Sequence, residues 1–94
     1  MKLKIPIQAK KNVYKAIIHN QILGNKCSTI VGKHRSNQIL EDKPMSKKTL
    51  QRTYAYLSRA KVYATGDWSR CGTISYNLWG GDAMHDYLKK LFKK

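Results

Sequence analysis

The segment 46–60 constrains the fold most, because its apolar residues recur with the period of a helix and its charged residues are all basic. Leu50, Tyr54 and Leu57 fall on one side of a helix that advances about 100° per residue. Ser46 is a good N-cap, and a proline two positions earlier disfavours helix before it. The other side collects Lys48, Gln51, Arg52, Ala55 and Arg59. The pattern predicts a helix with one buried side and one positively charged side.

Two short segments after this helix, 62–65 and 73–78, alternate apolar and polar residues, which is typical of strands with one buried face. The loop between them begins with Gly66 and ends with Gly72. We therefore predict a β-hairpin with Trp68 and Arg70 at its tip. There the two side chains would contact a sugar, a base or a phosphate; alternatively, Trp68 would fold back onto the core.

The segment 46–78, which contains the run TLQRTYAYLSRAKVYATGDWSRCGTISYNL, resembles the recognition helix and wing of a winged helix-turn-helix domain. The resemblance implies a small α+β domain of three to four helices with a β-hairpin wing. It also implies that the recognition helix enters the major groove of duplex DNA, where Gln and Arg bond base edges. A basic loop at 33–35 would add contacts to the DNA backbone. The predicted nucleic-acid-binding residues are Lys47, Lys48, Gln51, Arg52, Arg59, Lys61, Trp68, Arg70, Lys33 and Arg35.

The balance of charge favours a polyanionic partner. Nineteen Lys and Arg oppose five Asp and Glu, for a formal net charge of +14. Nucleic acid is the leading candidate, because neutralised phosphates release counterions and so supply affinity. The alternative partners for this positive charge are an anionic membrane surface and an acidic protein.

Several expectations about the whole chain follow. Its 94 residues fit one domain, 1–94, and no apolar run is long enough to span a membrane. We expect a cytoplasmic protein of a bacterial or viral host cell. We predict a sequence-specific or architectural DNA-binding protein of phage or plasmid type, which acts in transcription regulation or as an accessory factor of replication or recombination. The alternatives are an RNA- or ribonucleoprotein-binding protein and a small phage-type inhibitor of a host protein.

The remaining segments complete the expected domain. Residues 1–9 alternate as an extended arm or edge strand, 28–31 would be a short strand, and 36–43 a short helix. A helix over 11–23 would bury Tyr14, Ile17, Ile18 and Ile22. A helix capped by Asp82 would close the chain, with an apolar stripe that packs internally or pairs with a second subunit in a homodimer. The stripe consists of Met84, Tyr87, Leu88, Leu91 and Phe92.

Catalytic chemistry is not expected. The five carboxylates form no pair suited to acid–base work. A zinc site from Cys27, Cys71, His34 and His85 would lack the ligand spacing of known zinc sites. We therefore predict no enzyme, no metal and no cofactor. The two cysteines are expected to be free thiols in a reducing compartment, with a disulfide as the alternative.

Overall fold

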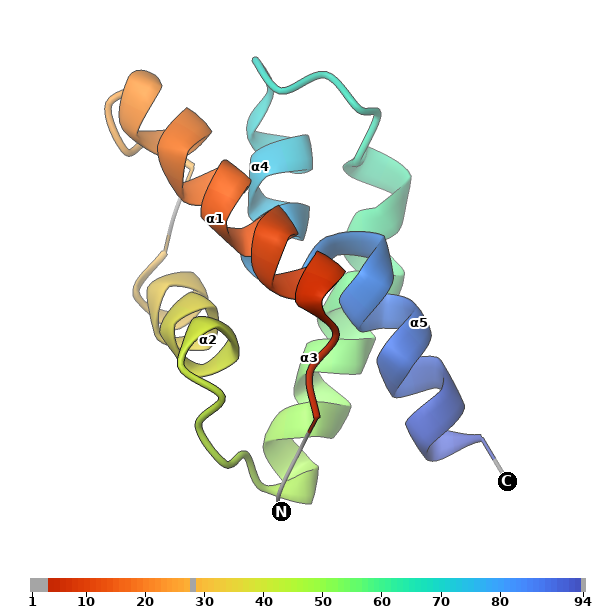
Figure 1. Cartoon of the computed structure of the whole chain (residues 1–94). Coiled ribbons are helices and arrows are strands. Elements are labelled where there is room, and N and C mark those ends of the chain that lie inside the picture. The colour runs from red at the N-terminus through yellow and green to blue at the C-terminus, as the bar shows by residue number, and fades with distance from the viewer. Residues whose placement is uncertain (1–3, 28, 94) are drawn as a thin grey trace.

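The computed structural model describes residues 4–27 and 29–93, and in these residues it forms five α-helices (Figure 1). A short 3-10 turn, η1 (Lys61–Tyr63), follows the third helix. No strand occurs in the described residues, so the predicted α+β class with a β-hairpin wing is wrong. The helices are α1 (Ile7–Ile22), α2 (Ile30–Leu40), α3 (Lys47–Ala60), α4 (Cys71–Leu78) and α5 (Gly81–Phe92).

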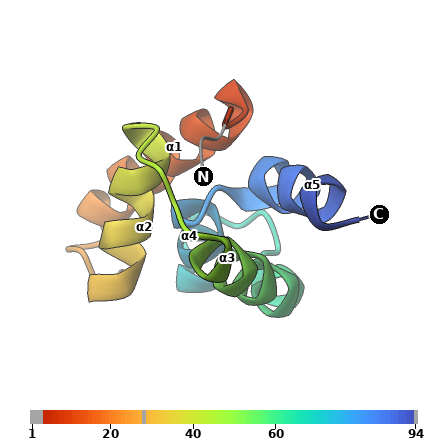
Figure 2. The same ribbon diagram turned by 90° about the horizontal axis from the view of Figure 1, so that it is seen from below.

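The central element is α4, which packs against all four other helices. Figure 2 shows it between α2 on one side and α3 and α5 on the other. Its side chains are buried at Thr73, Ile74, Tyr76 and Leu78, which lie in several directions around the helix axis. The core is therefore built around one short helix.

This position explains why the segment 73–78 was wrongly predicted to be a strand. A helix that is covered on several sides needs no amphipathic period, so its apolar residues can alternate by chance. The segment 62–65 is not a strand either. Val62 and Tyr63 both lie in η1, with 76% and 69% of their surface exposed.

Helix α3 forms as predicted. The Ser46 hydroxyl accepts a hydrogen bond from the Thr49 N–H at 3.1 Å, which satisfies a free donor of the first turn. Leu50 and Leu57 are fully buried, and Tyr54 is half-buried against the same core. The apolar side of α3 therefore packs against the core, and the basic side faces outward.

Helix α5 also forms, although Gly80 rather than Asp82 is its N-cap and Asp82 lies in the first turn. Met84 and Leu88 are fully buried, and α5 packs on α1 and α3. The predicted stripe thus packs within one chain, and the homodimer stays a prediction.

Helix α1 begins at Ile7, inside the segment 1–9 that was predicted to be extended; residues 1–3 of that segment lie outside the described residues. Its buried positions are small or polar: Ala9, Val13, Ala16 and Asn20. The prediction that Tyr14, Ile18 and Ile22 face the core is wrong, because their exposed fractions are 62%, 39% and 71%. Small residues let α1 cross α4 closely, and larger ones would hold it away.

Helix α2 replaces two predicted elements. Ile30 and Val31 open it, where a strand over 28–31 was predicted; Ser28 lies outside the described residues. Its last helical residue is Leu40, so the predicted helix 36–43 is real but begins earlier and ends earlier. The buried Ser36 hydroxyl lies 2.8 Å from the Leu78 carbonyl and so connects α2 to the end of α4.

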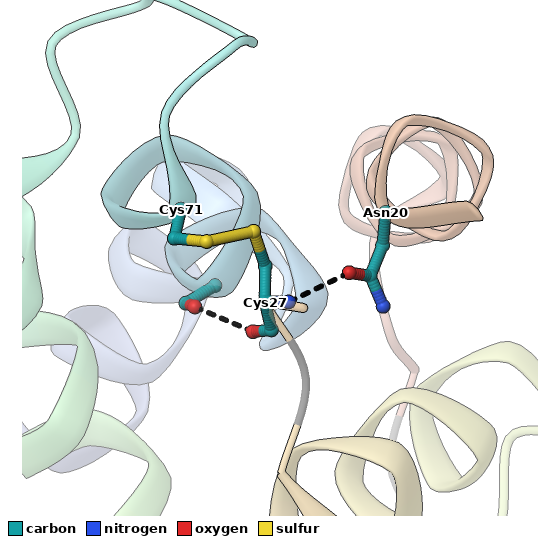
Figure 3. The surroundings of a disulfide bond; sticks show 4 residues. Asn20, Cys27 and Cys71 are labelled. Carbon is teal, nitrogen blue, oxygen red and sulfur yellow. Dashed lines mark hydrogen bonds between the residues drawn. A yellow bond between two sulfur atoms is a disulfide. The ribbon is translucent and has the colours of Figure 1, made fainter. Parts of the chain in front are cut away.

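A disulfide joins Cys27 to Cys71, so the prediction of free thiols is wrong (Figure 3). The bond ties the α1–α2 connection to the first residue of α4. The Cys27 N–H also donates to Asn20 Oδ1 at 2.9 Å, and Ser75 Oγ donates to the Cys27 carbonyl at 2.8 Å. A separation of 44 residues leaves no local signature, so only the packing of the helices brings the cysteines together.

The corner between α4 and α5 requires glycine at position 80. Gly80 has φ +106°, and a Cβ there would lie 2.3 Å from Met84 Cβ, which α5 holds rigidly. We expect Gly80→Ala to lower the free energy of unfolding by about 3 kcal/mol, from backbone strain and overpacking.

Urea unfolding followed by circular dichroism measures this, with Gly66→Ala as the matched control. Gly66 has φ +87° but open space around its Cβ position, so it isolates the backbone cost of about 1 kcal/mol. Equal losses in the two variants would contradict the overlap with Met84.

Candidate nucleic-acid interface

The outward side of α3 carries a continuous set of basic and amide side chains, here called the α3 basic face. Ser46 fixes where the helix starts, and Leu50 and Leu57 fix its rotation, so these side chains point away from the core. Its members, all exposed, are Lys47, Lys48, Gln51, Arg52 and Arg59.

The carboxylates of the described residues form their ion pairs elsewhere. Glu41 pairs with Lys43 at 3.1 Å, and Asp42 pairs with Lys10. The other contacts are Asp67 with Arg70 at 3.5 Å, Asp82 with Lys61 at 4.0 Å, and Asp86 with His85 at 3.8 Å. Across residues 4–27 and 29–93, no ion pair includes a cation of the α3 basic face. The positive charge of this face is therefore not paired with a carboxylate of the described residues.

Arg35 belongs to the same region, although the sequence placed it in a loop. It lies in α2, half-buried, with its guanidinium carbon 5.1 Å from the centre of the Trp79 ring. Its Nη1 donates to Gln38 Oε1, while its buried Nε has no hydrogen-bond partner among the described residues. Tyr56 of α3 stacks on Trp79 with ring centres 4.1 Å apart. Trp79 therefore connects Arg35 of α2 to α3.

Positive charges on α3 act on the side chains around Trp79. The pKa of the Arg35 guanidinium is lowered, first by burial and second by the positive charge of Arg52. Burial raises the pKa of the Tyr56 hydroxyl, and a hydrogen bond with Ser75 and the charge of Arg59 oppose that rise. Arg35 and the α3 basic face thus share one positive field.

The other predicted binding residues lie elsewhere. Trp68 is half-buried on α1, 4.9 Å from the His19 ring and 4.5 Å from the Lys15 ammonium, so it folds back and is not a wing tip. Arg70 precedes α4 and pairs with Asp67, and Lys61 contacts Asp82. Lys33 is exposed on α2. The structure therefore brings together Arg35 and the α3 residues, and it separates Trp68 and Arg70 from them.

No motif in the sequence pointed to Tyr56, Trp79 and Gln38. Trp79 contacts Arg35, which lies 44 positions earlier in the chain, and Tyr56, which lies 23 positions earlier. Neither spacing marks a motif. Only the arrangement of α2 and α3 around the end of α4 brings these rings and the guanidinium together.

One cluster resembles a hydrolytic triad in composition. Ser58 Oγ lies 3.2 Å from His85 Nε2, and His85 Nδ1 lies 3.8 Å from Asp86 Oδ1, beyond hydrogen-bond distance. Ser58 is in the last turns of α3, where backbone N–H groups bond within the helix and cannot line an oxyanion hole. The contact joins α3 to α5.

Cys27 and Cys71, two of the four zinc ligands considered from the sequence, are joined to each other.

Each helix in the described ranges is either too short or too polar to cross a lipid bilayer. Comparison of the chain with protein-family models, with curated proteins and with solved structures returned no match.

Proposed function

We propose that this chain is a nucleic-acid-binding protein that holds the phosphate backbone of duplex DNA through the α3 basic face and Arg35. The observation that supports this most is the absence of any carboxylate paired with that face in the described residues, while the acids pair elsewhere. A helix with four cations and Gln51 on one exposed side presents the donors that phosphates and base edges accept.

Duplex DNA is favoured over single-stranded RNA because both tryptophans and Tyr56 pack against other side chains, which leaves Tyr14 and Tyr63 as the strongly exposed aromatic residues. Trp79 is 8% exposed, and Trp68 is covered by α1. Stacking on unpaired bases needs open aromatic rings beside basic residues. At the α3 basic face, Tyr56 instead stacks on Trp79.

The test is fluorescence anisotropy with labelled duplex DNA, single-stranded DNA and RNA of unrelated sequence, across a salt series. We expect duplex to bind most tightly, with a slope of log K against log salt of roughly −4 to −5, as for about five neutralised phosphates. Weak binding to all three would overturn the proposal. An acidic protein at α1 would then be the stronger candidate, because Ile7, Tyr14 and Ile18 are exposed beside Lys11 and Lys15.

The predicted cytoplasmic location stays a prediction, and the disulfide argues against it. Disulfides persist in oxidising compartments and are rare in the cytosol. We propose that the protein works, or passes, where Cys27 and Cys71 remain oxidised.

A further inference from the structure

We infer that Arg35 of α2 and Arg52 of α3 form a binding site for one phosphate group, at the surface around Trp79. The inference deepens the proposed function and rests on it for the identity of the ligand, a phosphodiester of the DNA backbone. A free phosphate ion has the same chemistry and is separated from the backbone by the tests below.

Arg35 is held in place before any ligand arrives. Its guanidinium carbon lies 5.1 Å from the centre of the Trp79 ring, and Nη1 donates to Gln38 Oε1. A guanidinium carries five N–H donors, so others remain for an oxyanion. The Nε–H is buried without a partner among the described residues, so a phosphate has to bond the N–H groups in the exposed part of this half-buried side chain.

Arg52 supplies a second cation. It is exposed on α3, one turn before Tyr56, which stacks on the Trp79 ring that also carries Arg35. In the part of the chain that the structure describes, neither arginine pairs with a carboxylate. Two like charges brought together without a counter-ion repel each other, and an oxyanion between them would remove that repulsion. A phosphate fits because it offers several acceptor oxygens to two guanidinium groups.

The first experiment follows the arginine Nε–H signals by NMR while inorganic phosphate is added to the whole protein. We expect the Arg35 and Arg52 signals to shift and saturate together. Arg70 is the internal control, because its Nε already faces Asp67 at 3.5 Å. Equal, unsaturated shifts of Arg35, Arg52 and Arg70 would overturn the site.

The second experiment measures duplex affinity for Arg35→Gln, Arg52→Gln and the double variant, with Arg70→Gln as a matched loss of one charge. If both arginines hold one phosphate, each single variant should bind about tenfold more weakly and the double variant little more weakly than either. The salt slope should fall by about 1 in each. Additive losses, or losses no larger than that of Arg70→Gln, would overturn the inference.

The outcomes separate the two claims. Saturable phosphate shifts without duplex binding would leave a free-phosphate site and overturn the proposed function. Duplex binding that Arg35→Gln and Arg52→Gln leave at the level of the Arg70 control would keep the proposed function and remove the site. Arg35→Lys controls for misfolding, because lysine keeps the positive charge and the aliphatic stem of the side chain. It lacks the planar fork of a guanidinium, so this variant should still bind duplex more weakly than the native chain.

Discussion

Reduction of the Cys27–Cys71 disulfide is expected to lower the free energy of unfolding by about 4 kcal/mol. The bond closes a loop across 44 positions, and the conformational entropy that it removes from the unfolded chain grows with the logarithm of that length. For a chain of this size, the loss corresponds to a fall in Tm on the order of 15–25 °C. Thermal unfolding with and without reductant, followed by circular dichroism, measures it.

The double variant Cys27→Ser/Cys71→Ser is the matched control, because it lacks the bond without added reductant. The reduced native chain and this variant should melt at nearly the same temperature. Both should keep the helical spectrum at room temperature, since Asn20 and Ser75 still bond the backbone of residue 27. Two thiols that react with an alkylating agent in the unreduced native protein would contradict the disulfide itself.

Helices that carry their own signals could be predicted from the sequence. Helix α3 has a capping serine and an apolar stripe on one side only, and α5 has its acids first and its lysines last. Both sets of signals are local, and both helices lie where the sequence places them. The assignment of a basic outward side to α3 followed from the same periodicity.

The central helix and the face of α1 could not be predicted, because each depends on what surrounds it. Helix α4 has 8 residues and is covered by four helices, so the alternation in TISYNL reflects burial rather than a strand. On α1, large apolar residues were expected inside, yet the crossing with α4 selects Ala9, Val13 and Ala16. Close approach of two helices is a property of the pair, and neither sequence shows it alone.

The candidate site was predictable only in part, for the same reason. Lys48, Arg52 and Arg59 share a helix side by spacing alone, so the sequence identifies them. Arg35 joins them through Trp79, whose contacts depend on tertiary structure. Trp68 and Arg70 were assigned to a wing that is absent from the described residues, and the same segment instead packs on α1 and precedes α4.

Charge reversal on α3, in the double variant Lys48→Glu/Arg52→Glu, is expected to weaken duplex DNA binding by more than about 100-fold at roughly 0.1 M salt. Two attractive phosphate contacts become repulsive, and at this ionic strength charges within about 10 Å still act on each other. Fluorescence anisotropy with one labelled duplex gives the affinities.

Total charge must be separated from position, because any loss from +14 weakens binding to a polyanion. Lys89→Glu/Lys90→Glu is the matched control: each exchange removes two charge units, so both double variants fall from +14 to +10. Lys89 and Lys90 are exposed on α5, which packs on α3 but lies on the opposite side of the molecule from α2, the helix of Arg35 (Figure 2). The control should lose less than about fivefold.

Helix stability cannot explain the expected difference in DNA affinity, because the expected difference in stability between the two double variants has the opposite sign. Glu at position 48 lies in the first turn of α3, where the helix dipole favours a negative charge. Glu at positions 89 and 90 lies in the last turn of α5, where the dipole disfavours it by roughly 0.3–1 kcal/mol each. The variant with the weaker DNA binding should therefore be the more stable one. If the two double variants lose affinity equally, the chain binds DNA through its net charge, and α3 is not the interface.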